Sequence, residues 1–437
     1  MTSAEGGAPP APVSAQVTPG PRAAGACARC GVATTSIRDA EPWCPRCEWG
    51  LDRYEPARRH PEFGWQWVDR RTHRLAYRLT RHTFQQLISE GIDRRGGGLS
   101  RAVTVVASLL LLVLVALLVA CGVWLLVHDF PALTIPFGLA ALGLAYALRP
   151  RFGRLDSSAE VLDRERAPAL FRLVGEVAAA VGAPVPDVVA VDGAFGAYAT
   201  AVGLRRTRVL CIGLPLWAVL SPQERVALVA HELGHFVSGD VRRGLLTQPA
   251  LTMLGAAADL VRPVKSSMVE TSGLGVLLAE VVQRMLARLL FTAHVVLVGL
   301  GQRDAQRAEY LADEMSAKVA GSTAAASLAD VLLVVDAVEM VVRRDARAGR
   351  GPAEWRGSAD EARASAAASL PALRQLSVRD DASLFASHPP SGLRWRMIRE
   401  RPQHAPTVAL TEARLEPIES ELARHYERIA RDISWGG

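Results

Sequence analysis

The chain has 437 residues, of which 50% are hydrophobic and 22% charged, and its formal net charge is +6 at pH 7. Its mean hydropathy is +0.16, so with this much charge the apolar residues must be concentrated in blocks. These figures exclude a wholly disordered chain, a collagen-like fibre and a disulfide-rich miniprotein, and they argue against a purely soluble protein.

Residues 1–24 consist mainly of Ala, Gly, Pro, Ser and Thr, with almost no large apolar side chain. Such a segment cannot bury enough surface to offset the entropy lost on ordering. We therefore expect a disordered tail. A signal peptide is not expected, because no apolar core follows a basic start.

Residues 25–50 contain two CxxC pairs, Cys27 with Cys30 and Cys44 with Cys47. Each pair can place two thiolates on a tight turn, and two such turns complete the tetrahedral site that zinc favours. The pattern resembles a zinc ribbon with a structural zinc ion, because four cysteines leave no open coordination position. A redox-active CxxC is the alternative, but it needs a thioredoxin-like βαβ context that this sequence lacks.

Residues 51–100 are rich in Arg, His and aromatic residues, and apolar residues recur at helical spacing from 80 to 92. A basic segment beside a membrane is attracted to anionic lipid. We therefore expect a basic juxtamembrane segment that contacts the lipid bilayer. Nucleic-acid binding through Arg and Trp is the alternative, and we expect no nucleic-acid partner.

Residues 102–127 contain no charged side chain. As a helix they would be about 39 Å long, enough to cross a hydrocarbon core of about 30 Å with some tilt. Residues 131–148 are a second uncharged run, so residues 101–149 predict a transmembrane hairpin. Arg residues flank the hairpin on its outer sides only, which places both the zinc ribbon and residues 150–437 in the cytoplasm of a multi-pass cell (plasma) membrane protein.

The remainder reads as a mostly helical α+β segment. A helix is expected over 159–181, and strands over 187–191 and 208–212. Residues 245–261 and 289–301 are apolar enough for a second membrane hairpin within 245–301, and buried or membrane-surface helices are the alternative. Residues 343–370, rich in Arg, Ala, Gly and Ser, predict a linker or exposed loop.

Residues 231–235 read His231-Glu232-Leu233-Gly234-His235. On a helix, residues i and i+4 share a face, so both imidazoles can bind one ion while Glu232 reaches a water on that ion. A helix is expected because Ser221, Pro222 and Glu224 form the sequence pattern of a capping box.

A second charged pair follows at Glu309 and Asp313, one helical turn apart. Glu309 can supply a third ligand, and Asp313 can orient a ligand histidine. Two histidines and one carboxylate with an open fourth position is the pattern of a catalytic zinc site.

The HELGH motif followed by E-x-x-A-D resembles the M48 family of membrane zinc metallopeptidases, and within it the HtpX-like proteins, over about residues 150–400. Asp240, after the second histidine, matches a family aspartate near the metal. Ser387-His388-Pro389-Pro390 followed by Arg394 resembles the family's C-terminal motif. The resemblance implies that His388 and Arg394 lie near the active site and help to stabilise an oxyanion. Residues 195–199 match a segment that forms a substrate-aligning edge strand in related proteases, although Gly196 stands where the family often has Asn.

The resemblance implies a zincin-type (gluzincin) metalloprotease domain of the α+β class, with transmembrane helices and an added N-terminal zinc ribbon. The expected function is membrane-anchored, zinc-dependent hydrolysis of peptide bonds in polypeptide substrates, membrane proteins among them, as in membrane protein quality control. Two zinc ions are expected, one catalytic and one structural. The alternatives are a catalytically silent zinc-ribbon protein that binds or senses a partner, and a membrane-tethered nucleic-acid binder.

Overall fold

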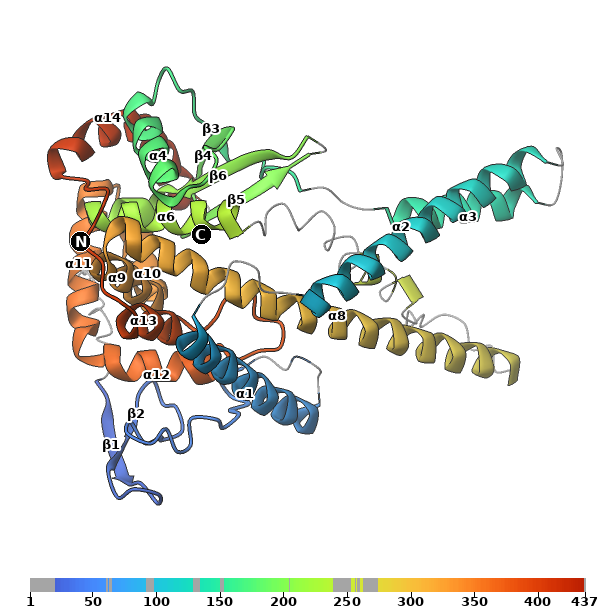
Figure 1. The fold of residues 1–437 in the computed structure, drawn as a ribbon, viewed down its shortest axis with the longest axis horizontal. Coiled ribbons are helices and arrows are strands. Elements are labelled where there is room, and N and C mark those ends of the chain that lie inside the picture. Colours follow the sequence, from blue (N-terminus) through green and yellow to red (C-terminus); the bar gives the residue numbers. More distant parts are fainter. Residues whose placement is uncertain are drawn as a thin grey trace, which may run out of the picture.

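The computed structural model describes residues 20–59, 62, 65–91, 98–128, 134–149, 153–203, 205–238, 253–255, 257, 260–261 and 274–435. These residues are mostly helical and include a four-stranded sheet, which confirms the predicted α+β class. In Figure 1, helices α2, α3 and the first half of α8 extend to one side of a globular body that contains the other elements. Asp240, residues 1–19 and much of the predicted hairpin at 245–301 lie outside the described residues.

The four-stranded sheet has the strand order β3-β4-β6-β5. The central strands β4 (Val188–Asp192) and β6 (Thr207–Gly213) run parallel and coincide with the two predicted strands. The edge strands β3 (Glu160–Val161) and β5 (Ala197–Val202) pair with them in antiparallel fashion. Because 160–161 joins the sheet, the helix expected over 159–181 begins only at the start of α4 (Pro168–Val181).

Two helices form the centre of the body, α6 (Pro222–Ser238) and α8 (Leu274–Ala320). At the start of α6 the backbone N–H of Ser221 donates to Glu224 Oε2 at 2.8 Å, which is half of the predicted capping box. Further along, Ser316 of α8 donates its hydroxyl to the carbonyl of Ala227 in α6 at 2.8 Å. Helix α5 (Leu214–Val219) leads into α6 and is buried throughout.

The predicted linker over 343–370 is wrong, because this segment is helical. Helices α10 (Val335–Arg347) and α11 (Pro352–Ala366) are joined by a short turn and followed by η1 (Ala367–Ser369) and α12 (Leu370–Asp380). Trp355 and Ala359 are fully buried, and buried Asp345 accepts from Arg350 at 3.0 Å. The Ala and Arg residues that gave the segment a loop-like composition are good helix formers once one face is buried. The remaining helices of the described body are α9 (Ser322–Leu333), α13 (Ser391–Glu400) and α14 (Glu412–Trp435).

The N-terminal part of the chain packs onto this body. Strands β1 (Arg22–Ala26) and β2 (Ala33–Ser36) form an antiparallel pair, so the disordered tail expected over 1–24 is too long by the residues that enter β1. Helix α1 (Gln66–Glu90) follows. Trp43, Leu51 and Phe84 belong to the same buried cluster as the core of the body, so the N-terminal part is not a separately folded appendage.

Helices α2 (Gly98–Val127) and α3 (Ile135–Ala147) lie side by side away from the body (Figure 1). They approach closely at two glycines, because a Cβ on Gly138 would stand 2.9 Å from the carbonyl oxygen of Gly122. Small residues of this kind let membrane helices pack closely. On length and composition, two helical stretches of the described residues can cross a membrane, Ala102–Val127 and Glu280–Ala320. Helix α3 is shorter, about 20 Å.

Candidate active site

Three predicted ligands meet between α6 and α8. His231 and His235 project from α6 toward Glu309 of α8, with His231 Nε2 at 3.4 Å from Glu309 Oε2 and His235 Nε2 at 3.5 Å from Glu309 Oε1. The candidate ligand atoms of the three residues lie within 4.8 Å of one another. Two imidazoles and one carboxylate in this arrangement match the protein ligands of a catalytic zinc site.

The surroundings of Glu309 fit a metal ion. Its side chain is buried, yet Oε2 accepts no hydrogen bond from the described residues. A buried carboxylate oxygen without a partner is costly unless another group satisfies it. His231 and His388 hold the pKa of Glu309 well below its usual range, against the effect of burial, so the carboxylate is ionised and can bind a cation.

Asp313 lies behind His231 and fixes the orientation of its ring. The Asp313 carboxylate is 3.0 Å from Nδ1 of His231, which leaves Nε2 directed toward Glu309. Burial and Arg394 act to lower the pKa of His231, but the neighbouring Asp313 and Glu309 carboxylates raise it to about 10, so binding of a metal ion at Nε2 must displace a proton from this ring. A carboxylate on the second nitrogen of a ligand histidine is the arrangement that sets ring orientation in many zinc sites.

Arg394 reaches the same cluster from α13. Its Nε and Nη2 donate to the two carboxylate oxygens of Asp313 at 2.8 and 2.6 Å, and Nη1 is 3.8 Å from Glu309 Oε2. The family resemblance implied an oxyanion-stabilising role for Arg394. Because the guanidinium is buried and forks around Asp313, its geometry is that of a positioning residue that holds Asp313 against His231.

Glu232 lies next to the ligands, where a general base is required. Burial, together with the charge of Glu309, raises the pKa of Glu232 to about 7, while His231, Arg394 and a hydrogen bond from the Ala199 backbone oppose the rise. Burial and the neighbouring His231 lower the pKa of His235 to about 4, which keeps this imidazole neutral, as a metal ligand must be. A carboxylate with a pKa near the working pH is suited to moving a proton.

The contact between Glu232 and Ala199 brings β5 to the site. β5 is an edge strand that pairs with β6 alone among the described residues, so no strand covers its outer edge. An extended peptide can add to such an edge by main-chain hydrogen bonds. Residues 195–199, which match the substrate-aligning segment of related proteases, therefore lead into a strand at the edge of the sheet, beside Glu232. The sequence did not predict the backbone contact with Glu232, which no side-chain pattern encodes.

His388 stands at the outer side of the cluster, between α12 and α13. Its Nδ1 is 2.9 Å from Glu309 Oε1, while 65% of its side chain is exposed. Asp240 lies outside the described residues.

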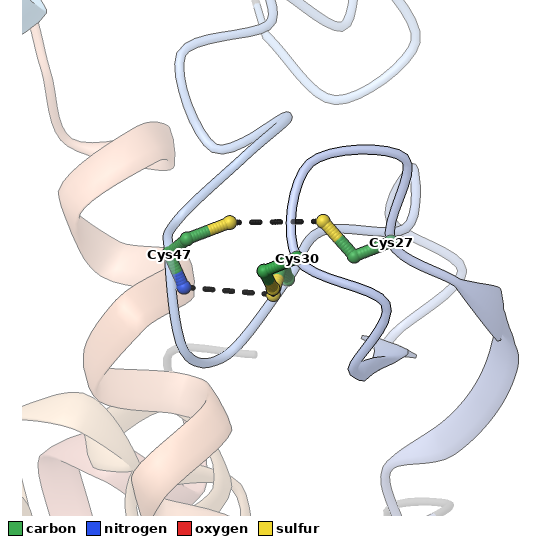
Figure 2. A group of neighbouring side chains, drawn as sticks. Cys27, Cys30 and Cys47 are labelled. Carbon is green, nitrogen blue, oxygen red and sulfur yellow. Dashed lines mark hydrogen bonds between the residues drawn. The ribbon is translucent and has the colours of Figure 1, made fainter.

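The four cysteines form a second cluster far from the first in sequence. Cys27 Sγ is 3.6 Å from Cys47 Sγ (Figure 2), and Cys30 Sγ is 3.4 Å from Cys44 Sγ. A tetrahedron with 2.3 Å zinc–sulfur bonds has edges of about 3.8 Å, so the four sulfurs are nearly at zinc-binding separations. A hydrogen bond from the Cys47 backbone lowers the pKa of Cys44 to about 6, whereas, against a backbone hydrogen bond from Trp49, burial and the neighbouring cysteines raise the pKa of Cys47 to about 12. Without a metal ion the cluster therefore favours the thiolate at Cys44 and the thiol at Cys47. All six cysteines are free of disulfides.

Comparison with known proteins gives one consistent result. The model of peptidase family M48 matches residues 164–402. Proteins named protease HtpX homolog are similar over much of the chain: that of Syntrophobacter fumaroxidans is 30% identical, covering 55% of this chain and 79% of the relative. The protein of Acidiphilium cryptum is 28% identical, covering 67% of this chain and 94% of the relative. The protein of Trichormus variabilis is 26% identical, covering 69% of this chain and 97% of the relative.

No solved structure is significantly similar to the chain. The matched segment contains both histidines, both acidic residues of α8 and the His388–Arg394 segment, so the match and the geometry describe the same site. The chain belongs to peptidase family M48.

Proposed function

We propose that this protein is a membrane-anchored, zinc-dependent endopeptidase. The observation that carries the proposal is the convergence of His231, His235 and Glu309, with the buried base Glu232 adjacent to them. A site that only stabilised the fold would not need an ionisable carboxylate at position 232. The alternative of a catalytically silent binding protein leaves this residue without a role.

Zinc held by His231, His235 and Glu309 supplies a Lewis acid that polarises a carbonyl and makes water acidic near neutral pH. The other steps belong to the chain itself. The Glu232 carboxylate accepts a proton from the attacking water and delivers it to the amine that leaves. Asp313 and Arg394 keep the His231 ring in place, and the β5 edge aligns the peptide backbone beside Glu232.

Membrane anchoring is supported by the surfaces of α2, α3 and α8. Their exposed side chains are large and apolar, and such a surface is stable only in contact with lipid or another protein. Arg residues flank the apolar helices 102–127 and 135–147 on the sides that lead to residues 51–100 and to the peptidase domain, and the link between them has no Arg or Lys. By the positive-inside rule, the site and the four cysteines face the cytoplasm of a multi-pass plasma membrane protein.

The start of α1 is suited to the membrane surface. Trp65 and Trp67 are more than half exposed there, and the Arg71 guanidinium lies 5.7 Å from the Trp67 ring. Exposed Trp beside Arg fits the headgroup region, where aromatic rings and basic side chains both gather. The lipid bilayer is thus the partner proposed for this segment.

Polypeptides at the membrane surface are the proposed substrates. Helix α8 is continuous from its apolar half to Glu309, and Leu297, which packs near Ala107 and Leu111 of α2, is about 18 Å from Glu309 along the helix. A cytoplasmic segment of a membrane protein can reach a site this close to the bilayer. That placement supports the proposed role in membrane protein quality control.

The test uses the full chain purified in detergent. We expect the unaltered protein to bind two zinc ions and to cleave casein, and Glu232→Gln to bind two zinc ions without cleaving. Glu309→Ala should bind one zinc ion and be inactive. Cleavage that persists in Glu232→Gln at the unaltered rate would refute the proposal.

A further inference from the structure

The cysteine-bearing segment, residues 20–59, is here named the four-cysteine module, and its loop between Cys44 and Cys47 contacts α12 directly. Trp43 is fully buried, and its Nε1 donates to Gln375 Oε1 of α12 at 2.8 Å. The Gln375 amide donates in return to the carbonyl of Pro45 at 2.8 Å. One side chain of α12 therefore pairs with backbone and side-chain groups on both sides of Cys44.

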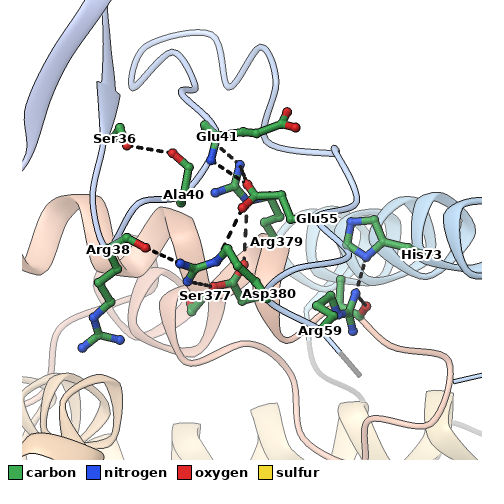
Figure 3. A network of polar contacts seen from close by, with 12 residues as sticks. Ser36, Arg38, Ala40, Glu41, Glu55, Arg59, His73, Ser377, Arg379 and Asp380 are labelled. Carbon is green, nitrogen blue, oxygen red and sulfur yellow. Dashed lines mark hydrogen bonds and ion pairs between the residues drawn. The ribbon is translucent and has the colours of Figure 1, made fainter. Parts of the chain in front are cut away.

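Charged contacts extend this interface along the same face of α12 (Figure 3). Arg379 is 1% exposed in its side chain, donates to the Glu41 carbonyl at 2.9 Å and pairs with Glu55 at 2.9 Å. Its guanidinium lies 5.2 Å from the Trp43 ring. A buried guanidinium that loses its partners is strongly unfavourable, so Glu41 and Glu55 of the four-cysteine module stabilise this position of α12. At the end of α12, Arg58 of the four-cysteine module pairs with Asp380 at 2.6 Å.

Helix α12 in turn fixes α13. The Ser377 hydroxyl accepts from the backbone N–H of Gly392 at 3.0 Å. A Cβ on Gly392 would stand 1.8 Å from the carbonyl oxygen of Arg374, so the two helices have no free space between them at this point. Such tightly packed helices move together, because close-packed interiors transmit displacement.

The segments held in this way carry two residues of the active site. Arg394, on α13, holds Asp313, and His388, just before α13, lies 2.9 Å from Glu309. The four-cysteine module also contacts both segments directly. Arg59 donates to the carbonyl of Ala382 at 2.8 Å, and Glu48, the residue after Cys47, is 3.8 Å from Arg396 of α13.

We propose that a zinc ion bound by Cys27, Cys30, Cys44 and Cys47 positions His388 and Arg394 through α12, so that peptidase activity depends on occupancy of the cysteine site. The proposal rests on the proposed peptidase function. Its physical basis is that Cys44 lies between Trp43 and Pro45, the two residues that pair with Gln375, so an ion on Cys44 holds both of these contacts in place. The four-cysteine module contributes two short strands and a few core side chains, and a structural metal ion commonly supplies the folding free energy of so small a unit. Gln375 and Arg379 are then positioning residues that act on the site from the far side of α12.

The test compares the full chain in detergent with four variants, measuring zinc content, thermal unfolding and initial rates over a range of casein concentrations. Gln375→Leu keeps the volume of the side chain and removes both hydrogen bonds to the four-cysteine module. We expect it to bind two zinc ions, to lower kcat at least tenfold because small displacements of catalytic groups cost that much or more, and to leave KM unchanged. Cys30→Ser with Cys47→Ser should bind one zinc ion and lose at least as much activity.

Arg53→Ala is the matched control, because Arg53 lies in the same module but pairs with Glu41 at an exposed site, with 47% and 50% of the two side chains accessible. It should match the unaltered chain in every measurement. A double substitution, Trp43→Phe with Gln375→Leu, should be no slower than Gln375→Leu alone, because Gln375→Leu has already removed the Trp43–Gln375 hydrogen bond that Trp43→Phe takes away.

Two results would overturn the inference: kcat within twofold of the unaltered chain in Gln375→Leu, or full activity in a chain that has lost only the cysteine-bound zinc. Should the cysteine variant fail to fold, the Gln375→Leu result alone decides. Failure of the peptidase proposal is distinguishable, because the unaltered chain would then be no more active than Glu232→Gln.

Discussion

Gly234 of α6 faces Ala312 of α8 so closely that a Cβ on Gly234 would stand 2.9 Å from the Ala312 Cα. Both residues belong to the chemical motifs, Gly234 between Glu232 and His235, and Ala312 between Glu309 and Asp313. Their small size lets the two helices approach until the ligands of α6 and α8 can share one ion. Gly234 and Ala312 take no part in the chemistry, but they set the distance between the metal ligands of α6 and those of α8.

Gly234→Ala should therefore separate α6 from α8. The added methyl group meets backbone and not a flexible side chain, so we expect loss of the active-site zinc and of casein cleavage. Gly175→Ala is the matched control, because Gly175 also lies inside a helix, has open space around it and should gain about 0.5–1 kcal/mol from helix propensity. Zinc content and thermal unfolding of both variants check this, and two zinc ions in Gly234→Ala would contradict it.

Arg394→Leu should leave Asp313 buried without its counter-charge. Breaking a buried pair by removing one partner costs about 3–5 kcal/mol, so we expect a large drop in thermal stability and weaker zinc binding. The exposed pair Arg414–Glu176 provides the comparison, because its side chains are 41% and 39% accessible and Arg414→Leu should cost no more than about 1 kcal/mol. Equal destabilisation by the two changes would show that the buried Arg394–Asp313 pair contributes no more to stability than the exposed Arg414–Glu176 pair.

His388→Ala should keep both zinc ions and slow cleavage. The side chain approaches Glu309 from the exposed side of the site, so its removal takes away a donor near the reacting carbonyl and leaves the ligands intact. Loss of one such donor lowers kcat by about 100-fold. His82→Ala, an exposed histidine of α1, should have no effect. Loss of zinc from His388→Ala would instead make His388 a metal ligand.

Acid should weaken the packing of α1 through His73. Burial, followed by the charge of Arg59, lowers the pKa of His73 to about 4, with Arg379 adding to the effect and backbone groups of Ala382 and Arg53 opposing it. The unfolded chain has a histidine pKa of about 6.5 and takes up the proton first, so stability is full above that pH and falls as the pH drops toward 4. The loss is on the order of 2 kcal/mol.

His73→Phe removes the titrating group and keeps the ring. Thermal unfolding of this variant should change less between pH 7.5 and pH 5 than that of the unaltered chain. An identical pH dependence in both would assign the acid sensitivity to other groups.

The amino-acid sequence by itself determined the features that depend on neighbours along the chain. The spacing of His231 and His235 places both on one face of any helix, and the residues from Ser221 to Glu224 begin that helix. The two CxxC pairs specify a thiolate cluster, and an uncharged run of 26 residues forms a helix whose apolar side chains stay exposed. Periodicity and local chemistry are sufficient for such features.

The tertiary structure decided what depends on contacts between distant segments. Composition predicted a linker over 343–370, because small and basic residues occur in loops as well as in helices. The segment is helical because its own side chains, Trp355 among them, pack into the core. The ion pair between Arg394 and Asp313 forms only because α13 lies beside α8 in the folded chain. The docking of Trp43 on Gln375, over 300 residues away in the chain, follows no local pattern, since long-range packing is selected by the whole core.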